Sequence, residues 1–298
     1  LSWLALLDAL WLSALGVALY ALCRYPTPSG VIEAEGVRRA RAFFGSPNNL
    51  ALYLERMLPI GLAMACWART RWRRWLYGLG AAPIALALGL TFSRGAWLLG
   101  LPAALLVLLW VRGGKIRWAI PVAVLLAALA LIPLAQSPRL ASALDLTQGT
   151  TALRLKLWQA SWAMARDHPW LGVGPDNFLY YYGDYILPGA EVDRWLSHPH
   201  NLALDFWLRL GIGGLALLIA LLSGFARRAT VWLRRPPRGE IAAASLGLTA
   251  GMAAALAHGL IDSFFFVIEL AYWLVFALAW INTQEPEQAH DLASFEAP

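Results

Sequence analysis

Long apolar runs alternate with short polar or basic segments along most of the chain. A helix that crosses a bilayer needs about 20 mostly apolar residues, and this criterion predicts eight spans. The run from Leu76 to Val111 is too long for one helix, and the segment 91–95 interrupts it, so we predict two helices joined by a turn there. The predicted spans are about 3–22, 50–68, two within 76–111, 118–135, 202–225, 242–260 and 264–281.

The composition supports an all-α, polytopic membrane protein. Of the 298 residues, 59% are hydrophobic and only 14% are charged, which is too little polar surface to enclose a soluble core. The net charge of +6 could indicate nucleic acid. The basic residues instead fall in short clusters between apolar runs, as in cytoplasmic loops, so no nucleic-acid partner is expected.

The positive-inside rule orients the predicted helices. The basic clusters at 69–74, 112–117 and 227–238 all fall on one side of the membrane, which is therefore predicted to be cytoplasmic. The segments 23–49 and 136–200 and the turns at 93–94 and 260–264 then face outward. Cys23 and Cys66 lie at opposite faces in this topology, which excludes a disulfide between them.

The chain begins with Leu1, and the first predicted span follows without a basic flank or a cleavage pattern. We therefore expect residues 1–298 to be a single membrane domain that lacks some N-terminal helices. Residues 136–200 form an outer-face loop inserted between the fifth and sixth spans. This loop includes part of the segment with the most polar chemistry, 154–214, which holds three of the five histidines.

The outer loop contains one amphipathic helix. Its apolar residues recur every three to four positions, and an adjoining face mixes cations with indoles, so the helix is expected to lie along the membrane surface. That placement would also account for Lys156 and Arg166. Pro169 is predicted to end the helix. The apolar residues are Leu153, Leu157, Ala160 and Met164, and the adjoining face carries Arg154, Trp158 and Trp162.

Arg94 lies between two apolar helices, where a buried cation would be costly, so we place it at the outer mouth of the turn. Two interpretations stay open. Arg94 is either a snorkelling side chain at the lipid headgroups or a phosphate clamp, since a guanidinium offers a planar fork of donors.

The segment His198–Asn201 lies where the loop re-enters the membrane. A histidine at a helix start is often a cap or an interface residue, but a neutral imidazole in a polar site can also accept a proton. His200 is the candidate base, and His198 is a weaker alternative. Asp205 lies one turn beyond Asn201, where it can orient the site or simply pair with Arg209.

His258 and Asp262 are also spaced four residues apart, near the outer end of the seventh span. They could hydrogen-bond each other as structural groups or support the site from behind. The acidic residues of the outer loop have no spacing that specifies a metal, and we predict none. These acidic residues are Asp184, Glu191 and Asp193.

An ordered set of motifs resembles the O-antigen ligase and O-antigen polymerase superfamily, over most of the chain from about residue 41 to 281. Each motif is modest alone, but the ordered set with its outward loop is quite specific. The motifs are Phe44–Asn49 (FGSPNN), Ser93–Trp97 (SRGAW), Arg154 followed by Trp158, His168–Phe178 (HPWLGVGPDNF), His198–Asn201 (HPHN) and Gly211–Leu215 (GIGGL).

The resemblance implies a bacterial inner-membrane glycosyltransferase with its active face outward. Such an enzyme moves a glycan from a polyprenyl-pyrophosphate carrier to a hydroxyl of a glycan, lipid or protein acceptor, inverts the anomeric centre and works without a metal ion. The family's essential arginines match Arg94 and Arg154, and its essential histidine matches His200. Asp205 stands where many members carry Glu or Gln.

The remaining polar and aromatic residues complete the expected site. His198, Asn201, Trp158 and Asp205 are expected to contact substrate, with Asp262 and His258 behind them. Trp195 and the segment 180–182 offer flat surfaces for sugar rings.

Two other classes of function compete with this interpretation. In a transporter or flippase for lipid-linked glycans, the arginines would guide the substrate, but charged groups would then be expected near the bilayer midplane. In a non-catalytic membrane scaffold, the histidine and the arginines would be incidental. The sequence does not separate a ligase from a polymerase, nor does it identify the sugar and acceptor.

Overall fold

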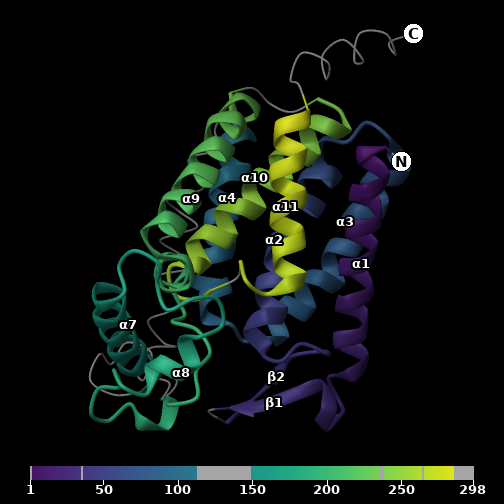
Figure 1. The fold of residues 1–298 in the computed structure, drawn as a ribbon. Coiled ribbons are helices and arrows are strands. Elements are labelled where there is room, and N and C mark those ends of the chain that lie inside the picture. The colour runs from purple at the N-terminus through teal and green to yellow at the C-terminus, as the bar shows by residue number, and fades with distance from the viewer. Residues whose placement is uncertain (1, 35, 113–148, 235–237, 264, 285–298) are drawn as a thin grey trace. The chain divides into compact units, whose positions relative to one another are not determined.

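The computed structural model describes residues 2–34, 36–112, 149–234, 238–263 and 265–284, and helices dominate this part of the chain (Figure 1). The predicted all-α membrane architecture is confirmed. The helices are α1 (Trp3–Arg24), α2 (Pro47–Trp67), α3 (Arg71–Leu90), α4 (Leu101–Arg112), α7 (Gly149–Asp167), α8 (Phe178–Tyr182), α9 (Leu202–Leu233), α10 (Glu240–Gly259) and α11 (Ile268–Thr283). The strands are β1 (Val31–Ala34) and β2 (Val37–Ala40), and the short helical turns are η1 (Pro28–Gly30), η2 (Ala96–Gly100) and η4 (Glu191–Asp193).

Most predicted spans correspond to observed helices. Among the described residues, α1, α2, α9 and α10 are long and apolar enough to cross a membrane. The shorter apolar stretches Ala96–Val111 and Ile268–Thr283 occupy two further predicted spans. The helix α3 begins earlier than expected, at Arg71, so the basic cluster forms its first turn. The predicted fifth span, 118–135, lies outside the described residues.

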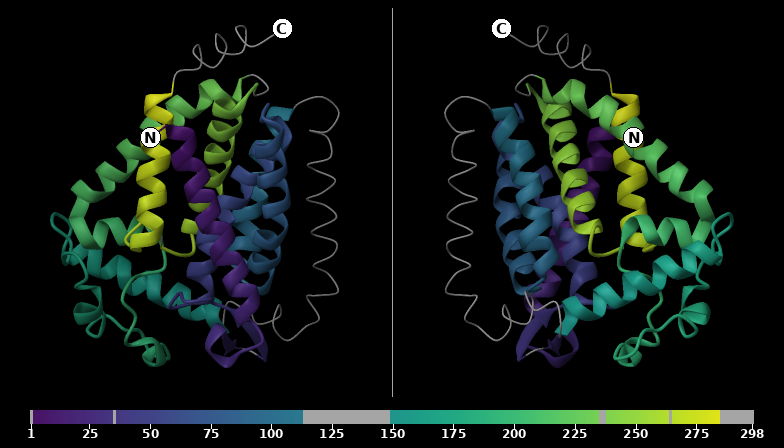
Figure 2. Two further views of the ribbon diagram at one scale, coloured as in Figure 1. Left: turned by 90° about the vertical axis from the view of Figure 1, so that its right-hand side faces the viewer. Right: turned by 90° about the vertical axis from the view of Figure 1, so that its left-hand side faces the viewer.

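The chain divides into two compact units. The first comprises Leu1–Arg117, Phe225–His258 and Phe264–Pro298, and the second comprises Trp118–Gly224 and Gly259–Ser263. In the first unit, α1, α2, α3, α4, α10 and α11 run side by side (Figures 1 and 2). Small residues allow this close packing, because a Cβ atom on Gly61 of α2 would lie 2.2 Å from the Trp11 ring of α1.

One polar cluster ties α1 to α3. The Arg73 guanidinium lies 2.8 Å from Asp8, and the Tyr77 hydroxyl donates to the other Asp8 oxygen at 2.8 Å. A carboxylate within an apolar span is costly unless it is paired in this way. The contacts therefore fix which face of α3 points toward α1.

The segment between α1 and α2 contains a hairpin that the sequence did not reveal. β1 and β2 pair antiparallel, with Val31 opposite Ala40 and Ala34 opposite Val37. Each strand has only four residues, and β2 contains two arginines, so the alternation of polar and apolar positions is weak. The hairpin was therefore not predicted from the sequence. Arg39 of β2 donates to the Thr91 carbonyl oxygen and to Asn48, both at 2.8 Å, and so ties the hairpin to neighbouring parts of the first unit.

In the second unit, α7 ends at Asp167, just before Pro169, as predicted. Its apolar face packs against α8, the following loop and the start of α9, and the expectation that the helix lies along the membrane surface stays a prediction. Lys156 donates to the Pro188 carbonyl oxygen at 2.7 Å. The Tyr185 hydroxyl donates a hydrogen bond to Asp167 Oδ2 at 2.9 Å. Burial and this carboxylate raise the pKa of Tyr185. The buried cluster comprises Leu157, Ala160, Met164, Ala165, Val173, Phe178, Tyr182 and Leu208.

A break in α9 explains the first glycine of the GIGGL motif. Gly211 has φ 68° and ψ −162°, a conformation that an L side chain rarely adopts. A Cβ atom there would lie 1.9 Å from the Trp170 carbonyl oxygen, and the next residue, Ile212, donates its N–H to the Pro169 carbonyl oxygen at 2.9 Å. The predicted sixth span is therefore interrupted, and the loop after α7 packs against the break.

Candidate active site

The HPHN segment enters α9 in a fixed conformation. His200 has φ 49°, an uncommon value for a residue other than glycine. The Trp158 indole N–H of α7 donates to the carbonyl oxygens of Pro199 at 3.1 Å and His200 at 3.3 Å. Trp158, expected to contact substrate, thus holds the backbone of the histidine segment.

Asn201 directly precedes α9 and ties its start to the turn after α10. Its side-chain oxygen accepts the Leu204 N–H at 3.0 Å, which caps the helix. Its side-chain nitrogen donates to the Leu260 carbonyl oxygen at 2.9 Å. Asn201, also expected to contact substrate, therefore positions the segment that carries Asp262.

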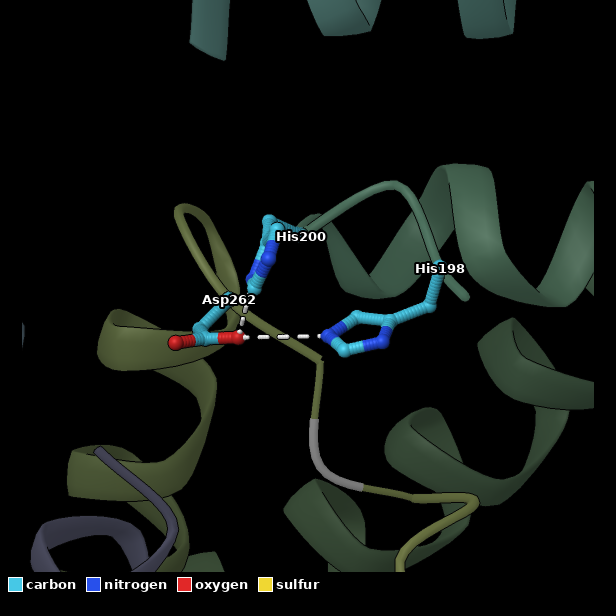
Figure 3. Close-up of side chains that lie close together, drawn as sticks. All are labelled: His198, His200 and Asp262. Carbon is cyan, nitrogen blue, oxygen red and sulfur yellow. Dashed lines mark hydrogen bonds and ion pairs between the residues drawn. The ribbon is translucent and has the colours of Figure 1, made fainter. Parts of the chain in front are cut away.

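Asp262 is the centre of the candidate site (Figure 3). Its Oδ1 lies 2.8 Å from His200 Nδ1 and 3.8 Å from His198 Nε2, and its Oδ2 lies 4.0 Å from Arg154 Nη2. The carboxylate is 3% exposed, whereas the His200 side chain is 23% exposed. When Nδ1 donates its proton to the carboxylate, Nε2 carries the lone pair and can accept a proton. The geometry is that of an oriented base.

The two histidines lie against each other, with ring centroids 4.2 Å apart. His198 Nδ1 hydrogen-bonds the Ser197 hydroxyl at 3.1 Å. His198 Nε2 lies 3.8 Å from Asp262 Oδ1, farther than His200 Nδ1 at 2.8 Å.

Asp205 lies in a buried polar network at the start of α9. It is buried, its Oδ1 accepts from Arg209 Nε at 2.8 Å, and its Oδ2 accepts the Ser263 hydroxyl proton. Arg209 also pairs with Asp176. The pairing with Arg209, one of the two alternatives, is thus observed, while the substrate contact of Asp205 stays a prediction. The Ser263 N–H donates to Asp262 Oδ1 at 2.9 Å.

His258 also has a partner that its spacing did not predict. In the first unit its Nδ1 lies 3.0 Å from both carboxylate oxygens of Glu55, and both residues are buried. The four-residue spacing suggested Asp262 as a partner, but His258 Nδ1 contacts Glu55 of α2, whereas Asp262 contacts the HPHN segment of the second unit. Glu55 could have been singled out from the sequence because it is an ionisable residue within an apolar span.

Glycines of the SRGAW segment and its continuation make room for this buried pair. A Cβ atom on Gly95 would lie 2.2 Å from His258 Nε2, and one on Gly100 would lie 2.3 Å from Glu55. Arg94 precedes Gly95 and is partly exposed. Arg94 belongs to the first unit and His200 to the second, so their convergence on one cavity stays a prediction.

His198, His200 and Asp262 also form a group that could hold a metal ion, because their ligand atoms lie within 4.8 Å of one another. Two imidazoles and a carboxylate are ligands that Zn²⁺ accepts. The positive charge of Arg154, 4.0 Å from the Asp262 carboxylate, would repel a metal ion bound to that carboxylate. The proton-accepting and metal-binding uses of these atoms exclude each other, which makes chelation a direct test.

Comparison with known proteins agrees with the motif pattern. Residues 79–219 match the family model described as O-antigen ligase. An O-antigen ligase of Pseudomonas aeruginosa is 29% identical over 266 residues, which cover 86% of this chain and 59% of that relative. The chain is therefore similar to an O-antigen ligase over most of its own length. The resemblance inferred from the motifs is thus confirmed, while the chain spans less than two thirds of the relative's length.

Proposed function

We propose that this protein is a glycosyltransferase that moves a glycan from a polyprenyl-pyrophosphate carrier to an acceptor hydroxyl, as an O-antigen ligase or polymerase. The observation that carries the proposal is the 2.8 Å contact between His200 Nδ1 and the buried Asp262 carboxylate. The likeness to an O-antigen ligase supports the substrate class.

In the proposed reaction, the acceptor oxygen attacks the anomeric carbon and the acceptor proton passes to His200 Nε2. The bond between the anomeric carbon and the phosphate oxygen breaks, and the polyprenyl pyrophosphate leaves with the electron pair. Direct displacement inverts the anomeric centre. General-base assistance is worth about 10²- to 10⁴-fold, and Asp262 stabilises the imidazolium that forms.

Arg154 is the proposed partner of the leaving pyrophosphate. Its guanidinium lies 4.0 Å from Asp262, and its side chain is 30% exposed, so it borders the same polar site and can still reach a ligand. An arginine fork matches phosphate oxygens and stabilises charge that builds on the leaving group. Arg94 is proposed as a second clamp, and the reaction requires no metal ion.

Trp158, Asn201 and Asp205 are proposed to hold the reacting residues in place. Trp158 and Asn201 hold the backbone of the HPHN segment and the Asp262 turn, and Asp205 holds Ser263. The exposed rings of Trp195 and Tyr180 are proposed to bind sugars of the donor or acceptor by stacking. The active face is proposed to be the outer face of a bacterial inner membrane.

A transporter of lipid-linked glycans is the second candidate, and the buried Glu55–His258 pair favours it. Ionisable pairs within membrane spans are typical of proton relays in pumps and transporters. An enzyme forms a new glycosidic bond, whereas a transporter returns its substrate unchanged.

The test uses purified protein, a defined polyprenyl-pyrophosphate glycan and candidate acceptors, with products identified by mass spectrometry. We expect a glycosylated acceptor and free polyprenyl pyrophosphate. His200→Ala and Arg154→Ala should each abolish product, while His168→Ala, a histidine of the same unit outside the site, should retain it. Intact donor alone with every acceptor, together with its movement across vesicles, would support the transporter instead.

A further inference from the structure

A cavity of about 720 Å³ lies where α2 ends and α3 begins. Its size is within the range of ligand-binding clefts, about 300–1,000 Å³. The lining comes from the end of α2, the connecting turn and the first turns of α3. Among the described residues that line it, three are arginines and none is acidic; the arginines are Arg69, Arg71 and Arg74. The cavity therefore has the charge of an anion site.

One face of α3 supplies most of this lining. The lining positions 71, 74, 75, 78 and 79 recur at three- to four-residue spacing, which places them on one side of the helix. Arg73 and Tyr77 contact Asp8 of α1 from another face. Arg74 donates to the Ala65 carbonyl oxygen at 3.2 Å, which ties the cavity face of α3 to the end of α2.

An apolar stripe continues from the cavity along α3. The side chains of Trp75 and Leu79, which line the cavity, are 58% and 67% exposed, and Leu86, two turns beyond Leu79, is 57% exposed. Exposed apolar side chains on a membrane helix face acyl chains, and tryptophan favours the headgroup level. The cationic cavity and the stripe together fit an amphiphile with an anionic head.

We propose that this cavity binds an anionic phospholipid, with its phosphate among Arg69, Arg71 and Arg74 and an acyl chain along Trp75 and Leu79. Guanidinium forks match phosphate oxygens, and basic pockets between membrane helices on the cytoplasmic side bind anionic headgroups. The positive-inside rule assigns the site to the cytoplasmic leaflet. The proposal is independent of the glycosyl-transfer reaction, since it concerns binding alone.

The test measures lipid retention by native mass spectrometry of the whole purified protein in detergent, titrated with phosphatidylglycerol or with phosphatidylethanolamine. We expect the wild type to retain phosphatidylglycerol in preference to phosphatidylethanolamine. A charge-assisted hydrogen bond contributes about tenfold in affinity, so three Arg→Gln changes, which remove the guanidinium contacts to the phosphate, should weaken phosphatidylglycerol binding by about 100-fold or more. These changes are at Arg69, Arg71 and Arg74.

A charge-matched control separates a built site from general attraction. Arg227, Arg228 and Arg234 are exposed, belong to α9 and its end, and do not line the cavity. Their triple Arg→Gln variant removes the same charge and should bind within about twofold of the wild type. Equal losses in the two triple variants would overturn the proposal, as would equal retention of both lipids.

Two further measurements guard against misfolding and against a simple anion site. Trp75→Ala removes an exposed wall of the cavity without changing charge, and should weaken phosphatidylglycerol binding several-fold while the melting temperature of lipid-free protein is unchanged. Glycerol phosphate added in excess should not displace the lipid, because it lacks the acyl chain. Unchanged binding in Trp75→Ala, or displacement by glycerol phosphate, would contradict the proposed lipid site.

Discussion

Replacing Asp262 with asparagine should lower the rate of glycosyl transfer by about 10³-fold. The carboxylate lies 2.8 Å from His200 Nδ1 and is 3% exposed, so it faces the imidazolium that forms when His200 takes the acceptor proton. Two opposite charges about 4 Å apart, at an effective dielectric constant of about 20, attract by about 4 kcal/mol. Loss of this attraction in the transition state corresponds to about 10³-fold in rate. The asparagine amide can also donate to Nδ1, which would leave the proton on Nε2 and block the base.

The assay is the initial rate of product formation by purified protein with a defined lipid-linked donor. We expect kcat to fall while KM for the donor changes little, because the carboxylate acts on the proton transfer and not on donor binding. Asp184→Asn, which removes an exposed carboxylate of the same unit, should transfer at the wild-type rate. A kcat within about threefold of wild type in folded Asp262→Asn would refute the reasoning, since general-base assistance is worth at least about 10²-fold.

Three further outcomes follow from other contacts. Trp158→Phe keeps the ring but removes the N–H that holds the HPHN backbone, and should lower kcat about 3- to 10-fold with little change in melting temperature. Chelation with EDTA should leave transfer unchanged, whereas added Zn²⁺ should inhibit, and His198→Ala should relieve that inhibition; loss of activity with EDTA would instead identify a metal enzyme. Gly95→Ala should lower the free energy of unfolding by about 2 to 4 kcal/mol because its Cβ atom displaces His258. Gly16→Ala, in open space, is the control, and equal thermal stability of the two variants would contradict the packing argument.

The membrane helices were predictable because a bilayer imposes a minimum length on every apolar span. Their details were not, because tertiary contacts set them. Gly211 breaks α9 where the Trp170 backbone packs against it, and the short strands β1 and β2 leave only a weak pattern in the sequence. The basic cluster around Arg71 predicted a cytoplasmic loop because of its charge. In the structure, α3 begins at Arg71, so most of the cluster lies in the first turn of this helix.

The candidate site was predictable in its residues and less so in their roles. The sequence singles out His200, Arg154 and Asp262, and in the structure the His200 and Arg154 side chains lie 2.8 and 4.0 Å from the Asp262 carboxylate. The pairing of His200 with Asp262 could not be derived, since 62 positions separate them. Spacing along one helix suggested local partners for His258 and Asp205. It found the Asp205–Arg209 pair but missed Glu55, which lies 203 positions from His258.

The role of His200 as the base is tested most directly by a single-turnover experiment with His200→Ala and a labelled polyprenyl-pyrophosphate glycan. We predict that the variant binds the donor with wild-type affinity but forms no glycosidic product, while the wild type converts the bound donor and releases polyprenyl pyrophosphate. Conversion at the wild-type rate by His200→Ala would contradict the assignment of His200 as the base.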